Sequence, residues 1–174
     1  MICSLGLMHM PDPLSGARQI HRVLKPGGRM SCVVHHEDSA LGGILAKSIR
    51  HGAALEHTDM PVDYSYVTRL GGDGVLQGLL EEAGLEEVQT ELNPSAAKHS
   101  GSREDWWNSF KGRGGCFGTL TSKLSAAADA AALRKFEELT VELGMWQEGE
   151  GVLTLPMPRV IGCGRKPAAS SSKL

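Results

Sequence analysis

Residues 1–37, MICSLGLMHMPDPLSGARQIHRVLKPGGRMSCVVHHE, carry the clearest structural pattern in the chain. The apolar run 1–7 predicts a short strand buried on both faces. The dipeptide Asp12-Pro13 predicts the start of a helix, because Asp is a good N-cap and proline fits the first helical turn. Pro26 and the two glycines after it predict a turn, and the apolar run that ends at His35 predicts a second strand. Strand, helix and strand with short connections predict two parallel strands.

The octet RVLKPGGR at 22–29, preceded by Pro11-Asp12-Pro13, resembles the region after the fourth strand of class I S-adenosylmethionine-dependent methyltransferases. The most similar subgroup, methyltransferase type 11, includes the quinone-biosynthesis C-methyltransferases. The resemblance covers 1–166 and implies the C-terminal portion of an α/β, Rossmann-like methyltransferase domain. In that family the last strand runs antiparallel between its two predecessors, and the runs 85–92 and 159–165 fit the final two strands. The resemblance therefore implies a sheet of four strands.

The front of the family's domain has no counterpart in this sequence. Its first three strands, its Gly-x-Gly-x-Gly motif and the acid that holds the cofactor ribose are absent. Two other glycine clusters, 71–74 and 112–115, lack a preceding strand, so ordinary turns are the favoured interpretation. We therefore expect a truncated or partial methyltransferase that is not active alone. The alternative is a non-catalytic, methyltransferase-like remnant that acts as an interaction protein.

The composition of the chain restricts its partners. The 174 residues suffice for one domain with a real core, and the net charge is −2. Without a basic field we expect no nucleic acid and no anionic membrane as partner, and no segment has the length of a transmembrane span. Four cysteines stand far apart without CxxC spacing, which favours buried, reduced thiols and a reducing compartment.

A helical insert is expected at about 101–148. Ser102 to Asp105 resembles a capping box, and the helix that follows carries an aromatic group. Ser125 then begins a long alanine-rich helix. Some members of the family contain a similar insert, so the resemblance implies a cap over the substrate pocket. Residues 167–174 are predicted to form a flexible tail.

The other predicted elements are less regular. The apolar spacing from Leu41 to Ile49 predicts a helix that is capped by Ser39 or Asp38 and stops at Gly52. A further helix over residues 75–80 is expected to be capped by Asp73, with Gly84 just past its end. Residues 93–100 are polar and predict an irregular segment, and the residues from 56 to 70 yield no element.

The resemblance places the end of the first strand beside the cofactor. It implies that the methionine end of S-adenosylmethionine lies against Ser4, Leu5, Gly6 and Leu7. His9 is the only titratable group on this turn and is the candidate catalytic base, which would take a proton from a substrate hydroxyl or carbon acid. The alternative, which we favour, is that His9 only hydrogen-bonds the turn before Asp12.

Four residues are candidates for contact with a small-molecule substrate: His35, Trp106, Trp107 and Arg113. Each has a plainer alternative: strand-end polarity for the histidine, core packing for the tryptophans, and a solvated loop for Arg113. A metal site at His35, His36 and His57 is disfavoured because adjacent strand residues point to opposite faces. No metal is therefore expected.

The last three residues, Ser172, Lys173 and Leu174, match the C-terminal address that the peroxisomal import receptor binds. If Leu174 is the natural terminus, we expect a peroxisomal protein, with a cytoplasmic one as the alternative. The remaining partner hypotheses are a missing N-terminal half, favoured by a strand that begins at Met1, and a homo-oligomer formed through an exposed strand edge.

Overall fold

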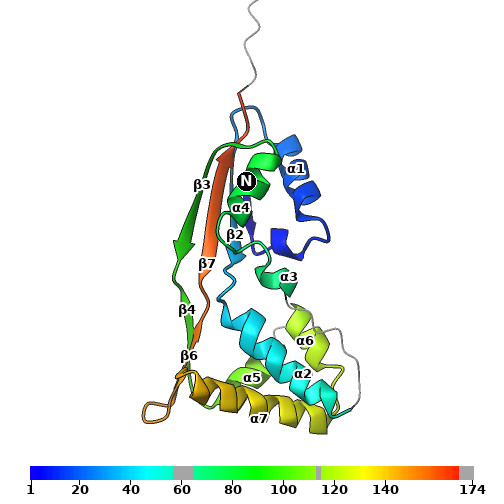
Figure 1. Ribbon diagram of the computed structural model, residues 1–174, viewed down its shortest axis with the longest axis vertical. Coiled ribbons are helices and arrows are strands. Elements are labelled where there is room, and N and C mark those ends of the chain that lie inside the picture. The colour runs from blue at the N-terminus through cyan, green and yellow to red at the C-terminus, as the bar shows by residue number, and fades with distance from the viewer. Residues whose placement is uncertain (57–64, 113–114, 169–174) are drawn as a thin grey trace, which may run out of the picture. The chain divides into compact units, whose positions relative to one another are not determined.

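The computed structural model describes residues 1–56, 65–112 and 115–168, and the chain divides into two compact units (Figure 1). The first unit comprises Met1–Ser39, Ser65–Ser95 and Pro158–Leu174. The second unit comprises Ala40–Tyr64 and Ala96–Met157. The predicted helical insert at 101–148 lies within the second unit. Among the described residues, no helix is both long enough and apolar enough to cross a membrane.

The first unit contains a four-stranded sheet in the order β1-β2-β7-β3. Its strands are β1 (Ile2–Ser4), β2 (Arg29–His35), β3 (Glu86–Asn93) and β7 (Arg159–Arg165). β1 runs parallel to β2, whereas β7 runs antiparallel to both β2 and β3. The four predicted strands and the position of the last one are therefore confirmed. β1 is shorter than predicted, because Leu5 has a φ of 53° and ends the extended backbone. The prediction that this strand is buried on both faces is wrong, since Ile2 and Ser4 are exposed.

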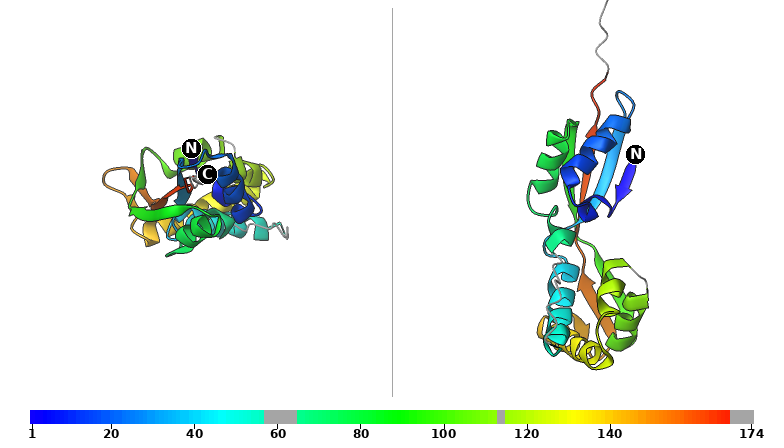
Figure 2. Two further views of the ribbon diagram at one scale, coloured as in Figure 1. Left: turned by 90° about the horizontal axis from the view of Figure 1, so that it is seen from above. Right: turned by 90° about the vertical axis from the view of Figure 1, so that its right-hand side faces the viewer.

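Helices cover one face of this sheet. The first unit contains η1 (Leu7–His9), α1 (Pro13–Val23), α3 (Ser65–Thr68) and α4 (Val75–Glu82), and Figure 2 shows α1 and α4 on the same side. Alternation along β2 turns Met30, Cys32 and Val34 toward the helices, and each is at most 2% exposed. Gly162 of β7 allows α4 to lie close, since a Cβ there would meet Leu76 at 2.9 Å. The β-branched and apolar alternation of β2 thus supplies the core.

The ends of the two longer helices differ in how well the sequence predicts them. Asp12 caps α1 as expected, because its carboxylate accepts hydrogen bonds from Ser15 N–H at 3.0 Å and from the Ser15 hydroxyl at 2.5 Å. The prediction that Asp73 caps α4 is wrong: the N-cap is Gly74, whose φ is 72°. Gly84 lies just past the end of α4, as predicted.

The second unit combines helices with a small sheet. Its helices are η2 (Leu41–Leu45), α2 (Ala46–Ala54), α5 (Arg103–Gly112), α6 (Gly115–Thr121) and α7 (Ala126–Glu142). Its strands are β4 (Ala96–Ser100), β5 (Trp146–Gln147) and β6 (Val152–Pro156), in the order β4-β6-β5. The expectation of an irregular segment at 93–100 is wrong, because Ala96–Ser100 pairs antiparallel with β6. Tertiary pairing overrides the weak strand propensity of this polar stretch.

α2 does not stop at Gly52, contrary to the prediction, but continues to Ala54. The glycine serves packing instead: a Cβ at Gly52 would lie 2.3 Å from the carbonyl oxygen of Ala128 in α7. The expected cap on the preceding turn is also absent, since Ala40 is the N-cap of η2 and forms no side-chain hydrogen bond. The predicted caps Ser102 of α5 and Ser125 of α7 are confirmed.

Candidate functional site

The candidate site lies in the first unit, where β1 and β2 end. Ligands of open α/β sheets bind outside the carboxyl ends of the strands, which makes this edge the place to look for chemistry. The start of the antiparallel strand β7 lies at this edge as well, because it pairs with the end of β2. Three segments therefore lie at this edge: the turn after β1, the end of β2 and the start of β7.

The turn after β1 is held from two sides. The backbone N–H of Leu5 donates to the carbonyl of Val33 at 2.9 Å. The guanidinium of Arg69 donates to the carbonyl of Met8 at 3.1 Å and also to the carbonyl of Met10. Charged donors of this kind are stronger than neutral ones. The turn is thus positioned before any ligand binds.

His9 lies on the outer side of this turn. Its side chain is exposed, and its ring packs edge-on against Tyr66 with the ring centroids 5.6 Å apart. The alternative role, a hydrogen bond from the His9 side chain to the turn before Asp12, is not among the described contacts. His9 remains accessible to a ligand at the edge of the sheet, so its proposed role as a base stays a prediction.

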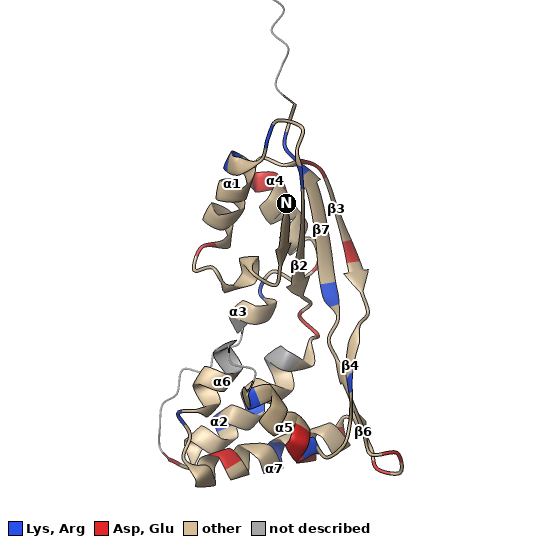
Figure 3. Ribbon diagram, turned by 180° about the vertical axis from the view of Figure 1, so that it is seen from behind, with Lys and Arg blue, Asp and Glu red and all other residues tan. Residues whose placement is uncertain are grey.

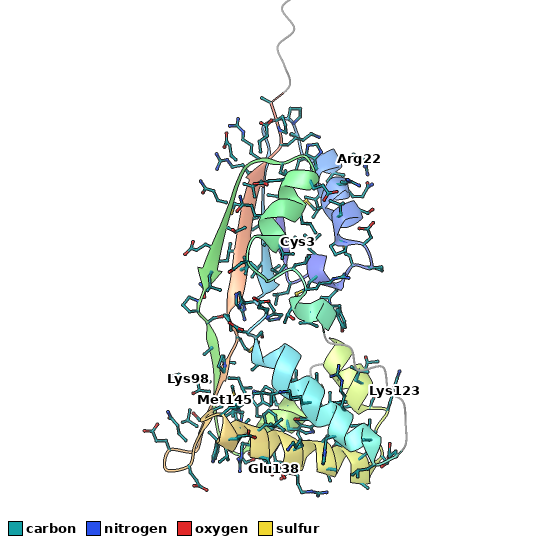
Figure 4. The ribbon with its side chains drawn as sticks, in the orientation of Figure 1. Cys3, Arg22, Lys98, Lys123, Glu138 and Met145 are labelled. Carbon is teal, nitrogen blue, oxygen red and sulfur yellow. The ribbon has the colours of Figure 1, made fainter. Side chains whose placement is uncertain are left out.

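The predicted cofactor-contacting residues differ in exposure. Ser4 is exposed, and Leu5 and Gly6 are half-buried. Leu7 is fully buried, so only its backbone could face a ligand. Cys3 (labelled in Figure 4) fills the space next to Gly6, where a Cβ would lie 3.1 Å from its sulfur. Together these residues can offer a narrow, mostly backbone contact surface.

His35 lies at the end of β2 and is 5% exposed. Burial lowers the pKa of its imidazole below the ordinary value of 6.5, and the nearby Arg159 and His9 lower it further. The structure therefore brings the two histidines predicted for the site into electrostatic contact. A neutral His35 can donate a hydrogen bond through one ring nitrogen and accept one through the other.

Sequence reasoning missed Arg159 as a site residue. It is the first residue of β7, and its Cα is the partner of the His35 Cα. Figure 3 shows basic residues on β7 in blue. The sequence could have indicated Arg159, because the predicted last strand begins at this residue and an antiparallel strand must begin where β2 ends. Tyr66 and Arg69 were missed because the segment that contains them yields no element from its sequence.

Gly71, the first residue of the cluster at 71–74, has a packing role. A Cβ at this position would lie 2.0 Å from the carbonyl oxygen of His35 and 2.6 Å from the Cα of His36. The glycine therefore allows the chain between α3 and α4 to cross the end of β2 in close contact. The cluster follows a short helix, not a strand, as the sequence indicated.

The tryptophans belong to the core of the second unit. Trp107 is fully buried and its indole N–H donates to Asp129 at 3.1 Å, while Trp106 is 7% exposed. Both rings pack on Phe136, with centroids 5.1 Å away for Trp106 and 5.4 Å away for Trp107. Their burial favours the core-packing alternative, and a substrate contact stays a prediction. Arg113 lies outside the described residues.

The histidines considered for a metal have other surroundings. The backbone N–H of Asp38 donates to Nδ1 of His36 at 3.2 Å, and His57 lies outside the described residues. Within the described ranges, no group of three or more His, Cys, Asp or Glu side chains is arranged to hold a metal ion.

A separate hollow lies near the opposite end of β2. Its volume is about 410 Å³, and its lining includes Arg29, Ser31, Glu87, Cys163 and Arg165. Glu87 already pairs with Arg29 at 3.2 Å and with Arg165 at 3.3 Å. Because this hollow is not at the carboxyl ends of the parallel strands, we do not assign it to the candidate site.

No protein-family model and no curated protein sequence matches the chain. Among solved structures, the YcgJ protein of Bacillus subtilis matches with a TM-score of 0.52 and 16% identity, over 97% of this chain and 63% of YcgJ. A candidate methyltransferase of Bacillus halodurans C-125 matches with a TM-score of 0.49 and 20% identity, over 96% and 68%. The phosphoethanolamine N-methyltransferase 2 of Haemonchus contortus, solved with phosphomonomethylethanolamine and S-adenosylhomocysteine, matches with a TM-score of 0.41 and 12% identity, over 95% and 32%.

The fold is thus α/β and Rossmann-like, and it is similar to that of YcgJ. In the order β1-β2-β7-β3 the antiparallel strand lies between β2 and β3, where the sequence resemblance implied it. The chain spans less than two thirds of YcgJ, and its described sheet is incomplete. Among the described residues, no strand–turn–helix unit offers a glycine loop.

Proposed function

We propose that this chain forms part of an S-adenosylmethionine-dependent methyltransferase that acts on a small organic acceptor. The supporting observation is the edge formed by β1, β2 and β7. There a preformed turn and two neighbouring histidines lie at the carboxyl ends of two parallel strands. Open α/β sheets bind their ligands at this location.

Residues of the first unit would share the work at this edge. The backbone from Ser4 to Leu7 would contact the methionine end of the cofactor, and Gly6 would allow close approach. His9 would take a proton from the acceptor as the methyl group is transferred. Trp106, Trp107 and Arg113 stay proposed as acceptor contacts on the sequence resemblance alone.

The cofactor loop and the acid that holds the ribose would come from residues outside this sequence. β1 has a partner strand only on the β2 side in the described structure, and Ile2 of β1 is 80% exposed. A further strand that paired with this edge would extend the parallel part of the sheet. A missing N-terminal half is therefore the proposed partner of the chain.

The test is a comparison of two proteins. If in-frame coding sequence upstream of Met1 contains the glycine motif, the longer product should bind S-adenosylmethionine in isothermal titration. Replacement of the first motif glycine by valine should abolish that binding. A folded longer product that does not bind the cofactor would exclude the proposed function.

The exposed edge of β1 also supports a second candidate, a non-catalytic interaction protein or a homo-oligomer. An apolar, unpaired edge strand is prone to association. Absence of any coding sequence for the glycine motif, together with a concentration-dependent mass in light scattering, would favour this candidate over the methyltransferase.

We also propose a peroxisomal location, conditional on Leu174 being the natural terminus. The residues concerned, Ser172 to Leu174, lie outside the described ranges, so the support is the sequence match alone. A fluorescent reporter that ends in residues 167–174 should enter peroxisomes, and deletion of Leu174 should return it to the cytoplasm. A diffuse signal from the intact tail would exclude the proposal.

A further inference from the structure

We propose that Arg159 and His35 bind an anionic group, a carboxylate or a phosphate, of the acceptor. This inference deepens the proposed function. It rests on that function only in one respect, which is that the bound anion belongs to the methyl acceptor. The existence of an anion site can be tested without a methyl donor.

Two buried nitrogens carry the inference. The Nε of Arg159 and the Nδ1 of His35 are both buried, and neither has a hydrogen-bond partner in the described structure. Their residues are Cα partners on neighbouring strands, so the two nitrogens belong to the same row of the sheet. Buried polar groups are nearly always paired, so two unpaired nitrogens on neighbouring strand residues require an explanation, and a bound anion would satisfy both.

Among the described residues no ion pair forms with Arg159, although Glu91 of β3, the Cα partner of Ile161, lies one pair along on the same face of the sheet. Asn93 of β3 is the Cα partner of Arg159 on the other side, and it supplies a neutral amide. The electrostatic neighbours of His35 are Arg159 and His9, both basic. Two acids follow the end of β2: Glu37 has its carboxylate beside Gly72, and Asp38 lies by His36, with 3.5 Å between its carboxylate oxygen and Nδ1 of that histidine.

The other end of the same strands provides the contrast. There Arg29 and Arg165 are Cα partners, and Glu87 pairs with both guanidinium groups. At this end of the sheet, away from the candidate site, Glu87 therefore balances the charge of the arginines. At the carboxyl end of β2 the described residues form no such ion pair with Arg159, and an incoming anion would supply the partner charge.

The chemistry of the pair suits an oxoanion. A guanidinium presents Nε–H and Nη–H donors in a planar fork that matches two oxygens of a carboxylate or phosphate. A neutral imidazole protonated at Nδ1 adds a third donor from the adjacent strand. Low exposure strengthens such charged hydrogen bonds relative to those at an open surface.

Nuclear magnetic resonance of the whole 174-residue chain is the direct test. Malonate, inorganic phosphate and the neutral malonamide serve as probes, and the resonances of the Arg159 Nε–H and of the His35 imidazole report binding. We expect saturable shifts with malonate, phosphate or both, and none with malonamide. If malonate binds with the higher affinity, the acceptor carries a carboxylate. If phosphate binds with the higher affinity, the acceptor carries a phosphate.

Substitutions locate the site. Arg159→Gln should weaken the binding of the anion at least about tenfold, as expected for the loss of a charged hydrogen bond. Arg165→Gln, at the far end of β7, is the matched control and should leave binding unchanged. If Arg159→Gln does not fold, the comparison of malonate with malonamide on the unaltered chain decides alone.

Three results would overturn the inference. The first is an equal response to malonamide and malonate. The second is unchanged affinity in a folded Arg159→Gln protein. The third is that S-adenosylmethionine itself shifts the same resonances, which would identify the anion as the carboxylate of the cofactor instead of the acceptor. Failure of the longer product to bind the cofactor would overturn the methyltransferase function and leave the anion measurement intact.

Discussion

His35 and Arg159 face each other across β2 and β7, and each buries a nitrogen that has no hydrogen-bond partner in the described structure. The two residues lie far apart in the sequence, and the antiparallel last strand brings them together. Chemistry at this edge of the first unit therefore depends on the final strand as much as on the strand–helix–strand segment that begins the chain.

The stability of the first unit should fall as the pH drops below about 6.5. The lowered pKa of His35 means that the unfolded chain binds a proton more readily than the folded one, so protonation favours unfolding. This contribution is fully present above the unfolded pKa and is lost as the pH falls toward the folded value. Urea unfolding at pH values between about 5 and 8 should show the loss.

His35→Leu should flatten this dependence, because it removes the group that titrates. The measurement stays above about pH 5 so that carboxyl groups do not contribute to the slope. Hydrogen bonds lower the pKa values of Asp12, Asp105 and Glu138, so these side chains change the stability only in more acidic solution. An unchanged slope in the variant would assign the effect to another group.

Gly71→Ala should destabilise the first unit by about 1–3 kcal/mol, because the new methyl group would overlap the His35 carbonyl. Gly78→Ala is the matched control. Gly78 lies inside α4 with no atom within 4 Å of a Cβ, so alanine should stabilise that helix by about 0.5–1 kcal/mol. Urea midpoints would compare the two, and equal effects would contradict the close crossing at His35.

Asp129→Ala should destabilise the second unit by about 1–2 kcal/mol. The substitution removes the acceptor for the buried indole N–H of Trp107 and the ion pair with Lys111, whose N–O distance is 2.5 Å. Asp129→Asn should cost less, because its amide oxygen can still accept from the indole. Unfolding followed by tryptophan fluorescence would rank the two variants, and a costlier Asn variant would contradict this assignment.

The cysteines of the sheet should react at very different rates. The expected burial of the cysteines is wrong for Cys163, which is exposed on the helix-free face, whereas Cys32 is fully buried and burial raises its pKa to about 12. Because the thiolate is the reactive form, iodoacetamide should modify Cys163 first and leave Cys32 unmodified in the folded chain. Peptide mass spectrometry would show the order, and early modification of Cys32 would reveal that the core opens.

Patterns that reflect local physics predicted much of this fold. Apolar runs bounded by turns identified β2 and β7 with their observed bounds, and Asp12-Pro13 identified the start of α1. These features depend on neighbours in sequence, so a single chain reveals them. The prediction that the helix ends at Gly52 failed because this glycine packs against α7, a helix from another part of the chain.

The site was less accessible to sequence reasoning for the same reason. The sequence could place His9 and His35 at the ends of strands, but it could bring Arg159 to the same edge only once β7 is paired with β2. β4 was likewise missed, because its polar residues form a strand only beside β6. Long-range pairing decides both cases, and no local pattern encodes it.

The central claim is that this chain holds only one part of a cofactor site, and titration of S-adenosylmethionine into the purified chain tests it most directly. The glycine loop and the ribose-binding acid would together contribute several hydrogen bonds, worth on the order of several kcal/mol, and each 1.4 kcal/mol is about tenfold in affinity. We predict no saturable heat in the micromolar range. Micromolar binding by the chain alone would contradict the claim and show that its own residues complete the site.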